Sequence, residues 1–132
     1  MKYKNTAMFT DAFIKENSMG PNPVKLLEQI LTRYPLKTGS VVLDLGCGKG
    51  LTSILLAKAY GVKVFATDLW ITPTENKKRF DEAGLTRDQI VPIGAEAHAL
   101  PYAEEFFDAV VCIDSYHYYG CEDGYLETHL LP

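Results

Sequence analysis

A carboxylate followed by three evenly spaced glycines is the feature of this sequence most able to support chemistry. The run Asp44-Leu45-Gly46-Cys47-Gly48-Lys49-Gly50 comes directly after the apolar residues 41–43. Glycine permits backbone angles that a Cβ would forbid, and it leaves the main chain bare enough for a ligand to lie against it. Residues 51–60 then have apolar side chains at helical spacing, so the unpaired amides of a helix N-terminus would point into the turn. The pattern indicates a nucleotide-binding turn between a strand and a helix.

The elements that must position this turn predict a parallel α/β sheet. Residues 41–45 and 62–68 have the composition of buried strands, and the helix between them gives a right-handed βαβ unit. Thr72-Pro73-Thr74-Glu75 has capping-box spacing, which predicts a helix from Pro73 to Ala83. Further strands are expected at residues 90–93 and 107–113, and residues 122–131 are expected to open another helix.

Two helices are expected before the first strand. Residues 10–17 can form a short amphipathic helix, and Asn22-Pro23 offers an N-cap followed by proline at the first helical position. The second helix should run to Pro35. Its predicted buried face consists of Leu26, Leu27, Ile30, Leu31 and Tyr34.

Composition narrows the class of protein. The 132 residues fit one ordinary domain, and 13 basic against 17 acidic residues give a dispersed net charge of −4. Such a charge balance does not favour binding to nucleic acid or to an anionic membrane. No apolar run approaches the ~18 residues needed to span a bilayer. The three cysteines show no C-x-x-C pairing, which suits reduced thiols and disfavours a metal site. We therefore expect a cytoplasmic protein.

The glycine run resembles the first motif of class I S-adenosylmethionine-dependent methyltransferases, Asp/Glu-x-Gly-x-Gly-x-Gly, at every fixed position. The dinucleotide fingerprint spaces its glycines G-x-G-x-x-G, and it fails because position 51 is Leu. The phosphate-loop motif fails because Leu43 stands where its first glycine belongs. The resemblance covers residues 22–131. It implies a doubly wound, Rossmann-like α/β fold that binds S-adenosyl-L-methionine.

The resemblance also implies roles for residues at the carboxyl ends of the strands. Asp68 would accept hydrogen bonds from the ribose hydroxyls, and Leu69 would flank the adenine together with Trp70. Glu96, where the family usually has aspartate, and Ala97 would meet the adenine ring. Residues 112–115 would line the methionine moiety, and Asp44 would hold the glycine loop and approach the methionine amino group. The expected cofactor-binding residues are Asp44, Gly46, Cys47, Gly48, Gly50, Asp68, Leu69, Glu96, Ala97 and Ile113.

The resemblance does not assign a catalytic base. Methyl transfer from a sulfonium is an in-line displacement whose rate depends largely on positioning, so no base is obligatory. Asp114 or His117 could serve as one, although a histidine within an aromatic cluster such as residues 116–119 often has only a packing role. The catalytic residue is left unassigned.

The family's sheet continues beyond a fourth strand, whereas this sequence provides only four. The expected organisation is an N-terminal helical segment at 1–35 and an incomplete S-adenosylmethionine-binding domain at 36–132, truncated after the fourth strand. That strand would normally be interior, so its free edge should favour self-association.

The function implied by the resemblance is methylation of a small molecule, with this chain as the cofactor-binding part of the enzyme. Neither nucleic acid nor a membrane is an expected partner. A non-catalytic S-adenosylmethionine-binding module is an alternative. An NAD(P)-binding oxidoreductase is a further one, opposed by Gly50 and by the step Leu100-Pro101-Tyr102.

Overall fold

A four-stranded parallel sheet forms the centre of the protein in the computed structural model, which describes residues 3–18 and 22–132. The strands are β1 (Val41–Leu45), β2 (Lys63–Asp68), β3 (Ile90–Gly94) and β4 (Ala109–Val111). Their order is β3-β2-β1-β4, and each neighbouring pair is parallel. The α-helices are α1 (Asp11–Asn17), α2 (Pro23–Arg33), α3 (Leu51–Ala59) and α4 (Pro73–Glu82). The predicted α/β fold is confirmed.

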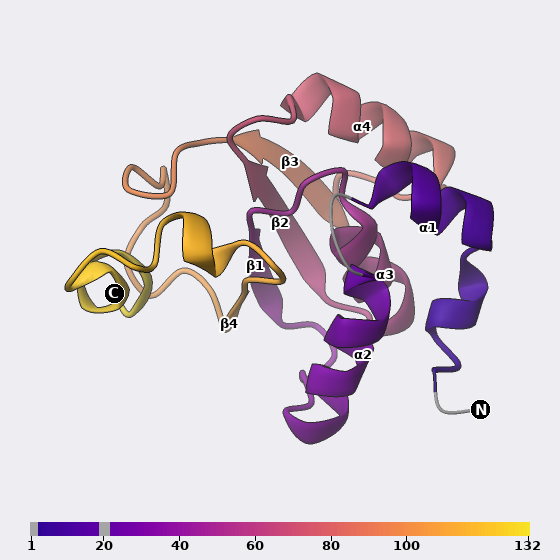
Figure 1. Cartoon of the computed structure of the whole chain (residues 1–132), viewed down its shortest axis with the longest axis horizontal. Coiled ribbons are helices and arrows are strands. Elements are labelled where there is room, and N and C mark those ends of the chain that lie inside the picture. The colour runs from indigo at the N-terminus through magenta and orange to yellow at the C-terminus, as the bar shows by residue number, and fades with distance from the viewer. Residues whose placement is uncertain (1–2, 19–21) are drawn as a thin grey trace.

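The alternation of side chains along the strands gives the sheet two covered faces. Val42, Val64 and Ala66 belong to a core shared with side chains of α2, α3 and α4. Leu43, Leu45 and Phe65 belong to a second cluster, formed with residues from 97–107 and 112–130. In Figure 1 the helices α2 and α3 accordingly lie on one side of the sheet and the C-terminal segment on the other.

Local sequence signals explain where the helices begin. The side chains of Thr10, Asn22 and Thr72 each accept a hydrogen bond from a backbone amide in the first turn of the helix that follows. Pro23 and Pro73 occupy the first helical positions, where no amide is needed. The starts predicted from the capping signals of α2 and α4 are confirmed.

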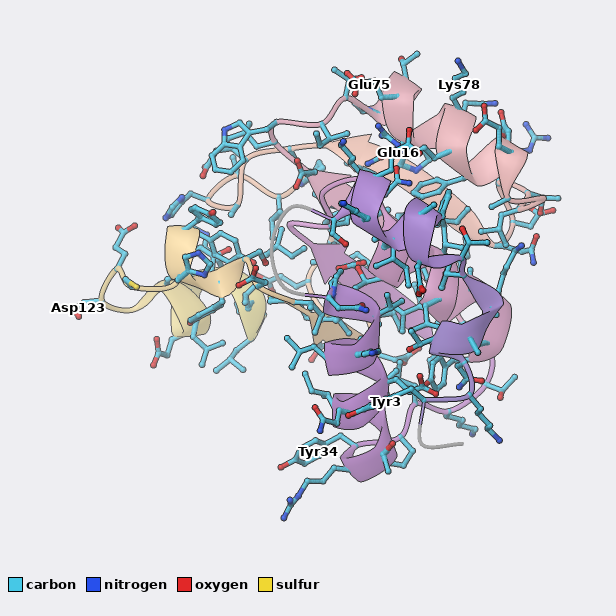
Figure 2. The ribbon with its side chains drawn as sticks, turned by 45° about the vertical axis from the view of Figure 1, so that its right-hand side comes forward. Tyr3, Glu16, Tyr34, Glu75, Lys78 and Asp123 are labelled. Carbon is cyan, nitrogen blue, oxygen red and sulfur yellow. The ribbon has the colours of Figure 1, made fainter. Side chains whose placement is uncertain are left out.

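The predicted buried face of α2 is partly wrong. Leu27 and Leu31 are buried, but Leu26, Ile30 and Tyr34 are exposed, and Tyr34 points away from the protein at the end of the helix (Figure 2). The buried stripe is rotated because Glu28 occupies an inward position. Its carboxylate accepts hydrogen bonds from the Asn5 and Thr6 amides at 2.9 and 3.0 Å and from the Thr6 hydroxyl. Burial opposes ionisation of Glu28, but these hydrogen bonds lower its pKa overall.

The C-terminal elements are shorter than expected. The strand predicted at 107–113 spans only Ala109–Val111. Before it, the side chain and the amide of Asp108 are hydrogen-bonded to the backbone of Val41. After it, the chain turns towards Ser115, whose hydroxyl is hydrogen-bonded to the Leu45 carbonyl. The helix predicted at 122–131 is a single turn at Leu126–Leu130. Within the described ranges, none of the helices is both long and apolar enough to cross a bilayer.

Candidate functional site

The glycine loop after β1 is held in a conformation that glycine tolerates best. Gly46, Gly48 and Gly50 have φ angles of +72°, +55° and +80°, in the left-handed region. The amides of Gly46 and Cys47 both donate to the carbonyl of Thr67 in β2, at 2.8 and 3.1 Å. The loop is therefore tied to the end of the neighbouring strand, and α3 begins immediately after it.

Asp44 lies beneath the loop rather than on its surface. Its Oδ2 accepts hydrogen bonds from the hydroxyls of Thr52 and Ser53 at 2.6 and 2.7 Å, which ties β1 to the first turn of α3. Its Oδ1 is buried and has no hydrogen-bond partner among the described residues. Burial raises the pKa of Asp44 to about 6, against the effect of the two hydroxyls. A buried carboxylate with a free oxygen favours a nearby positive charge.

Asp68 closes β2 and connects two loops through one side chain. Its Oδ1 accepts from the Gly48 amide at 3.1 Å, and its Oδ2 accepts from the amides of Trp70 and Ile71 at 3.0 and 2.9 Å. A carboxylate oxygen can accept two hydrogen bonds, so Oδ1 retains capacity for a ligand hydroxyl.

The turn after β3 forms another wall, and it contains Glu96 and Ala97. The carboxylate of Glu96 accepts a hydrogen bond from the His98 amide and forms another with the ring nitrogen Nδ1 of His98, both at 2.8 Å. These hydrogen bonds lower the pKa of Glu96 and raise the pKa of His98. The other ring nitrogen of His98, Nε2, lies 2.7 Å from the Oε2 of Glu122, close enough for an ion pair when the imidazole is protonated. The hydroxyl of Tyr125 donates to the Ala97 carbonyl at 2.7 Å. The C-terminal segment thus braces this wall.

The segment after β4 is fixed to the end of β1. The Ser115 hydroxyl donates to the Leu45 carbonyl at 2.8 Å and lies 2.9 Å from the Tyr119 hydroxyl. Burial raises the pKa of Tyr119, so its hydroxyl stays protonated. Asp114, with φ of +55°, faces the cavity, whereas His117 packs on the ring of Tyr118 and does not line it.

These walls enclose a cavity of about 200 Å³ at the carboxyl ends of β1, β2, β3 and β4. Such a position is where ligands bind in open α/β sheets. Most of the predicted cofactor-binding residues line it: Gly46, Cys47, Gly48, Asp68, Leu69, Glu96, Ala97 and Ile113. Asp44 and Gly50 do not line it, and Cys112, expected beside Ile113, packs into the second hydrophobic cluster instead.

Several residues of the site are not predicted from the sequence, and three of them come from the helices α1, α2 and α4. Asn76 in α4 is buried and donates to the Gly48 carbonyl at 2.8 Å, which supports the loop from below. Asn76 lies one helical turn before Phe80, the other buried residue of α4, and this spacing is the sequence signal that places Asn76 on the buried face. Asn17 and Pro23, from α1 and α2, line the cavity although they lie far from the motif in sequence, and nothing in the local pattern marked them.

Comparison with known sequences gives consistent matches. Residues 42–128 match the family described as "Methyltransferase domain". The chain is 32% identical over 96 residues to 27-O-demethylrifamycin SV methyltransferase of Amycolatopsis mediterranei (strain S699), covering 71% of this chain and 35% of that protein. It is 33% identical over 92 residues to methyltransferase GfsG of Streptomyces halstedii, covering 69% of this chain and 33% of that protein. The chain thus spans about a third of the length of these relatives.

Comparison with solved structures supports the fold. A S-adenosylmethionine-dependent methyltransferase of Geobacter sulfurreducens, solved with S-adenosyl-L-homocysteine, superposes with a TM-score of 0.68 at 21% identity. The match covers 89% of this chain and 48% of that one. The four parallel strands described above thus have a counterpart in a known α/β protein.

Proposed function

The chain belongs to the methyltransferase-domain family, and we propose that it forms the S-adenosyl-L-methionine-binding part of an enzyme that methylates a small molecule. The observation that carries this proposal is the cavity, in which the glycine loop, Asp68 and the turn at residues 95–97 converge. The small-molecule acceptor is inferred from the relatives above, one of which is a methyltransferase of 27-O-demethylrifamycin SV. The three unpaired cysteines are in keeping with a cytoplasmic location.

The residues present fit the proposed cofactor. The free Oδ1 of Asp44 provides buried negative charge near the loop, which suits the ammonium group of the cofactor's methionine end. Asp68 has acceptor capacity for ribose hydroxyls. Ala97 and Leu69 supply apolar surface where a planar base can lie. When bound, the cofactor supplies an electrophilic methyl group.

The part played by this chain is positioning. The loop is fixed by bonds to Thr67, Asp68 and Asn76, and the segment after β4 is fixed by Ser115. In-line methyl transfer gains much of its rate from holding the reacting groups at the correct distance and angle. Asp114 is the candidate base that faces the cavity, and it remains a prediction, as does His117.

Asp68→Ala is expected to weaken binding of S-adenosyl-L-homocysteine by about 1.5–3 kcal/mol, the range for losing hydrogen bonds to a charged group. Isothermal titration calorimetry measures this, with the exposed Asp88→Ala as the matched control. Titration with NAD in the same buffer tests the nicotinamide alternative. Heat with NAD but none with S-adenosyl-L-homocysteine would overturn the proposed function, and an unchanged affinity in folded Asp68→Ala would remove Asp68 from the site.

We also propose that the chain associates with itself through β4. This strand lies at one edge of the sheet, it pairs only with β1 among the described strands, and Val110 on it is exposed. A free, apolar strand edge favours pairing with another chain. Sedimentation velocity over a range of concentrations should show concentration-dependent association, which the gatekeeper substitution Val110→Lys should reduce. A sharp monomer at every concentration would contradict this proposal.

A further inference from the structure

Two exposed aromatic side chains meet at the mouth of the cavity. Trp70 follows β2 by two residues, and Tyr118 belongs to the short helical turn Tyr116–Tyr118 after β4. Their ring centroids lie 5.3 Å apart with an interplanar angle of 86°, an edge-to-face contact. Both residues line the cavity, and both are 64% exposed. The pair is therefore part of the ligand-binding surface rather than of the core.

The strand order makes this contact a bridge across the cavity. β2 and β4 pair with opposite edges of β1, so the loops that follow them stand on either side of the glycine loop. A contact between side chains of these two loops spans the carboxyl end of β1. It thus joins the wall that follows β2 to the wall that follows β4, across the glycine loop.

The backbones that carry the two rings are held by hydrogen bonds, whereas most of each side chain lies in solvent. The Trp70 amide is bonded to Asp68, and the Tyr118 amide donates to the Ser115 carbonyl at 3.0 Å. An aromatic pair contributes only about 0.5–1.5 kcal/mol beyond its buried area, and here most of each side chain remains in solvent. Such a contact can open and close by side-chain rotation, on a fast timescale for exposed residues.

We propose that Trp70 and Tyr118 form an aromatic clasp that opens to admit the cofactor and closes over it, so that the contact slows cofactor dissociation. The proposal rests on the proposed function, because it takes S-adenosyl-L-methionine and its demethylated product as the ligands. The clasp acts on the rate of exchange and on the orientation of the bound ligand, and it takes no part in bond making.

The sequence contains a single tryptophan, so the fluorescence of Trp70 reports directly on the clasp. Stopped-flow mixing with S-adenosyl-L-homocysteine should change this emission, and displacement should give the dissociation rate constant. Tyr118→Leu is expected to raise that constant about threefold to tenfold, from the energy range of an aromatic pair. Tyr118→Phe keeps the ring and should retain the original rate constant. Tyr34→Leu removes a comparably exposed tyrosine remote from the cavity and should also leave it unchanged (Figure 2).

A double-mutant cycle separates the clasp from two independent ligand contacts. Dissociation of radiolabelled S-adenosyl-L-homocysteine should be accelerated by Trp70→Leu and by Tyr118→Leu, and the double variant should be little faster than either, because both remove the same contact. Additive effects of the two substitutions, or an unchanged dissociation rate in Tyr118→Leu, would overturn the clasp. The proposed function would still stand if calorimetry showed that the unaltered chain binds S-adenosyl-L-homocysteine. Absence of calorimetric binding to the unaltered chain would overturn both.

Discussion

Gly46→Ala is expected to destabilise the protein by about 2–5 kcal/mol and to reduce binding of S-adenosyl-L-homocysteine at least tenfold. The added methyl group would overlap the Cβ of Ser115 and lie 2.7 Å from its hydroxyl oxygen. Ser115 cannot easily move away, because its hydroxyl is bonded to the Leu45 carbonyl and to Tyr119. The φ angle of +72° adds the cost of a left-handed conformation for a residue with a Cβ.

Gly84→Ala is the matched control for this prediction. Gly84 has a φ of +79°, and a Cβ placed there would meet nothing within 4 Å. It should therefore show only the backbone cost, about 1–2 kcal/mol, with ligand binding retained. Urea unfolding gives both free energies, and calorimetry gives both affinities. Equal destabilisation of the two variants would mean that the segment after β4 does not hold the glycine loop in place.

The fold could be predicted largely because its signals are local. A buried strand, a glycine turn and a helix follow one another within residues 41–60, and capping residues mark the starts of α2 and α4. The face of α2 could not be predicted in the same way. Its orientation depends on hydrogen bonds that the Glu28 carboxylate accepts from the amides of residues 5 and 6. The spacing of apolar residues does not predict these hydrogen bonds.

The residues of the candidate site could likewise be predicted only where a local sequence signal marks them. Residues at the ends of strands were identifiable, because parallel strands bring their carboxyl ends to one edge. Asn76 and Asn17 were missed because each reaches the site through tertiary packing of a helix. The motif predicts that Gly50 contacts the ligand. The structure instead gives it a packing reason, since a Cβ there would lie 2.5 Å from the ring of Phe80.

Asp44 is expected to make ligand binding depend on pH near 6. Burial raises its pKa to about 6, and its Oδ1 has no partner among the described residues. A ligand with an ammonium group favours the ionised carboxylate, so protonation of Asp44 competes with binding. Affinity should therefore be constant at neutral pH and fall about tenfold as the pH drops from 7 to 5. Calorimetry with S-adenosyl-L-homocysteine across this range measures the effect.

Asp44→Asn separates this charge from the structural role of the same side chain. The amide oxygen can still accept from Thr52 and Ser53, so the fold should be kept. Folding raises the pKa of Asp44, so its protonated form stabilises the folded chain at low pH. This stabilisation is lost as the pH rises through the folded pKa, and the buried charge then opposes folding. At neutral pH the unliganded variant should thus be as stable as the original chain or slightly more so, by thermal unfolding. Its affinity at neutral pH should be lower by at least about tenfold, as expected for loss of the Asp44 charge, and nearly independent of pH apart from the titration of His98 beside Glu96. Asp88→Asn should retain the original pH profile, and an unaltered profile in Asp44→Asn would show that the buried carboxylate does not sense the ligand.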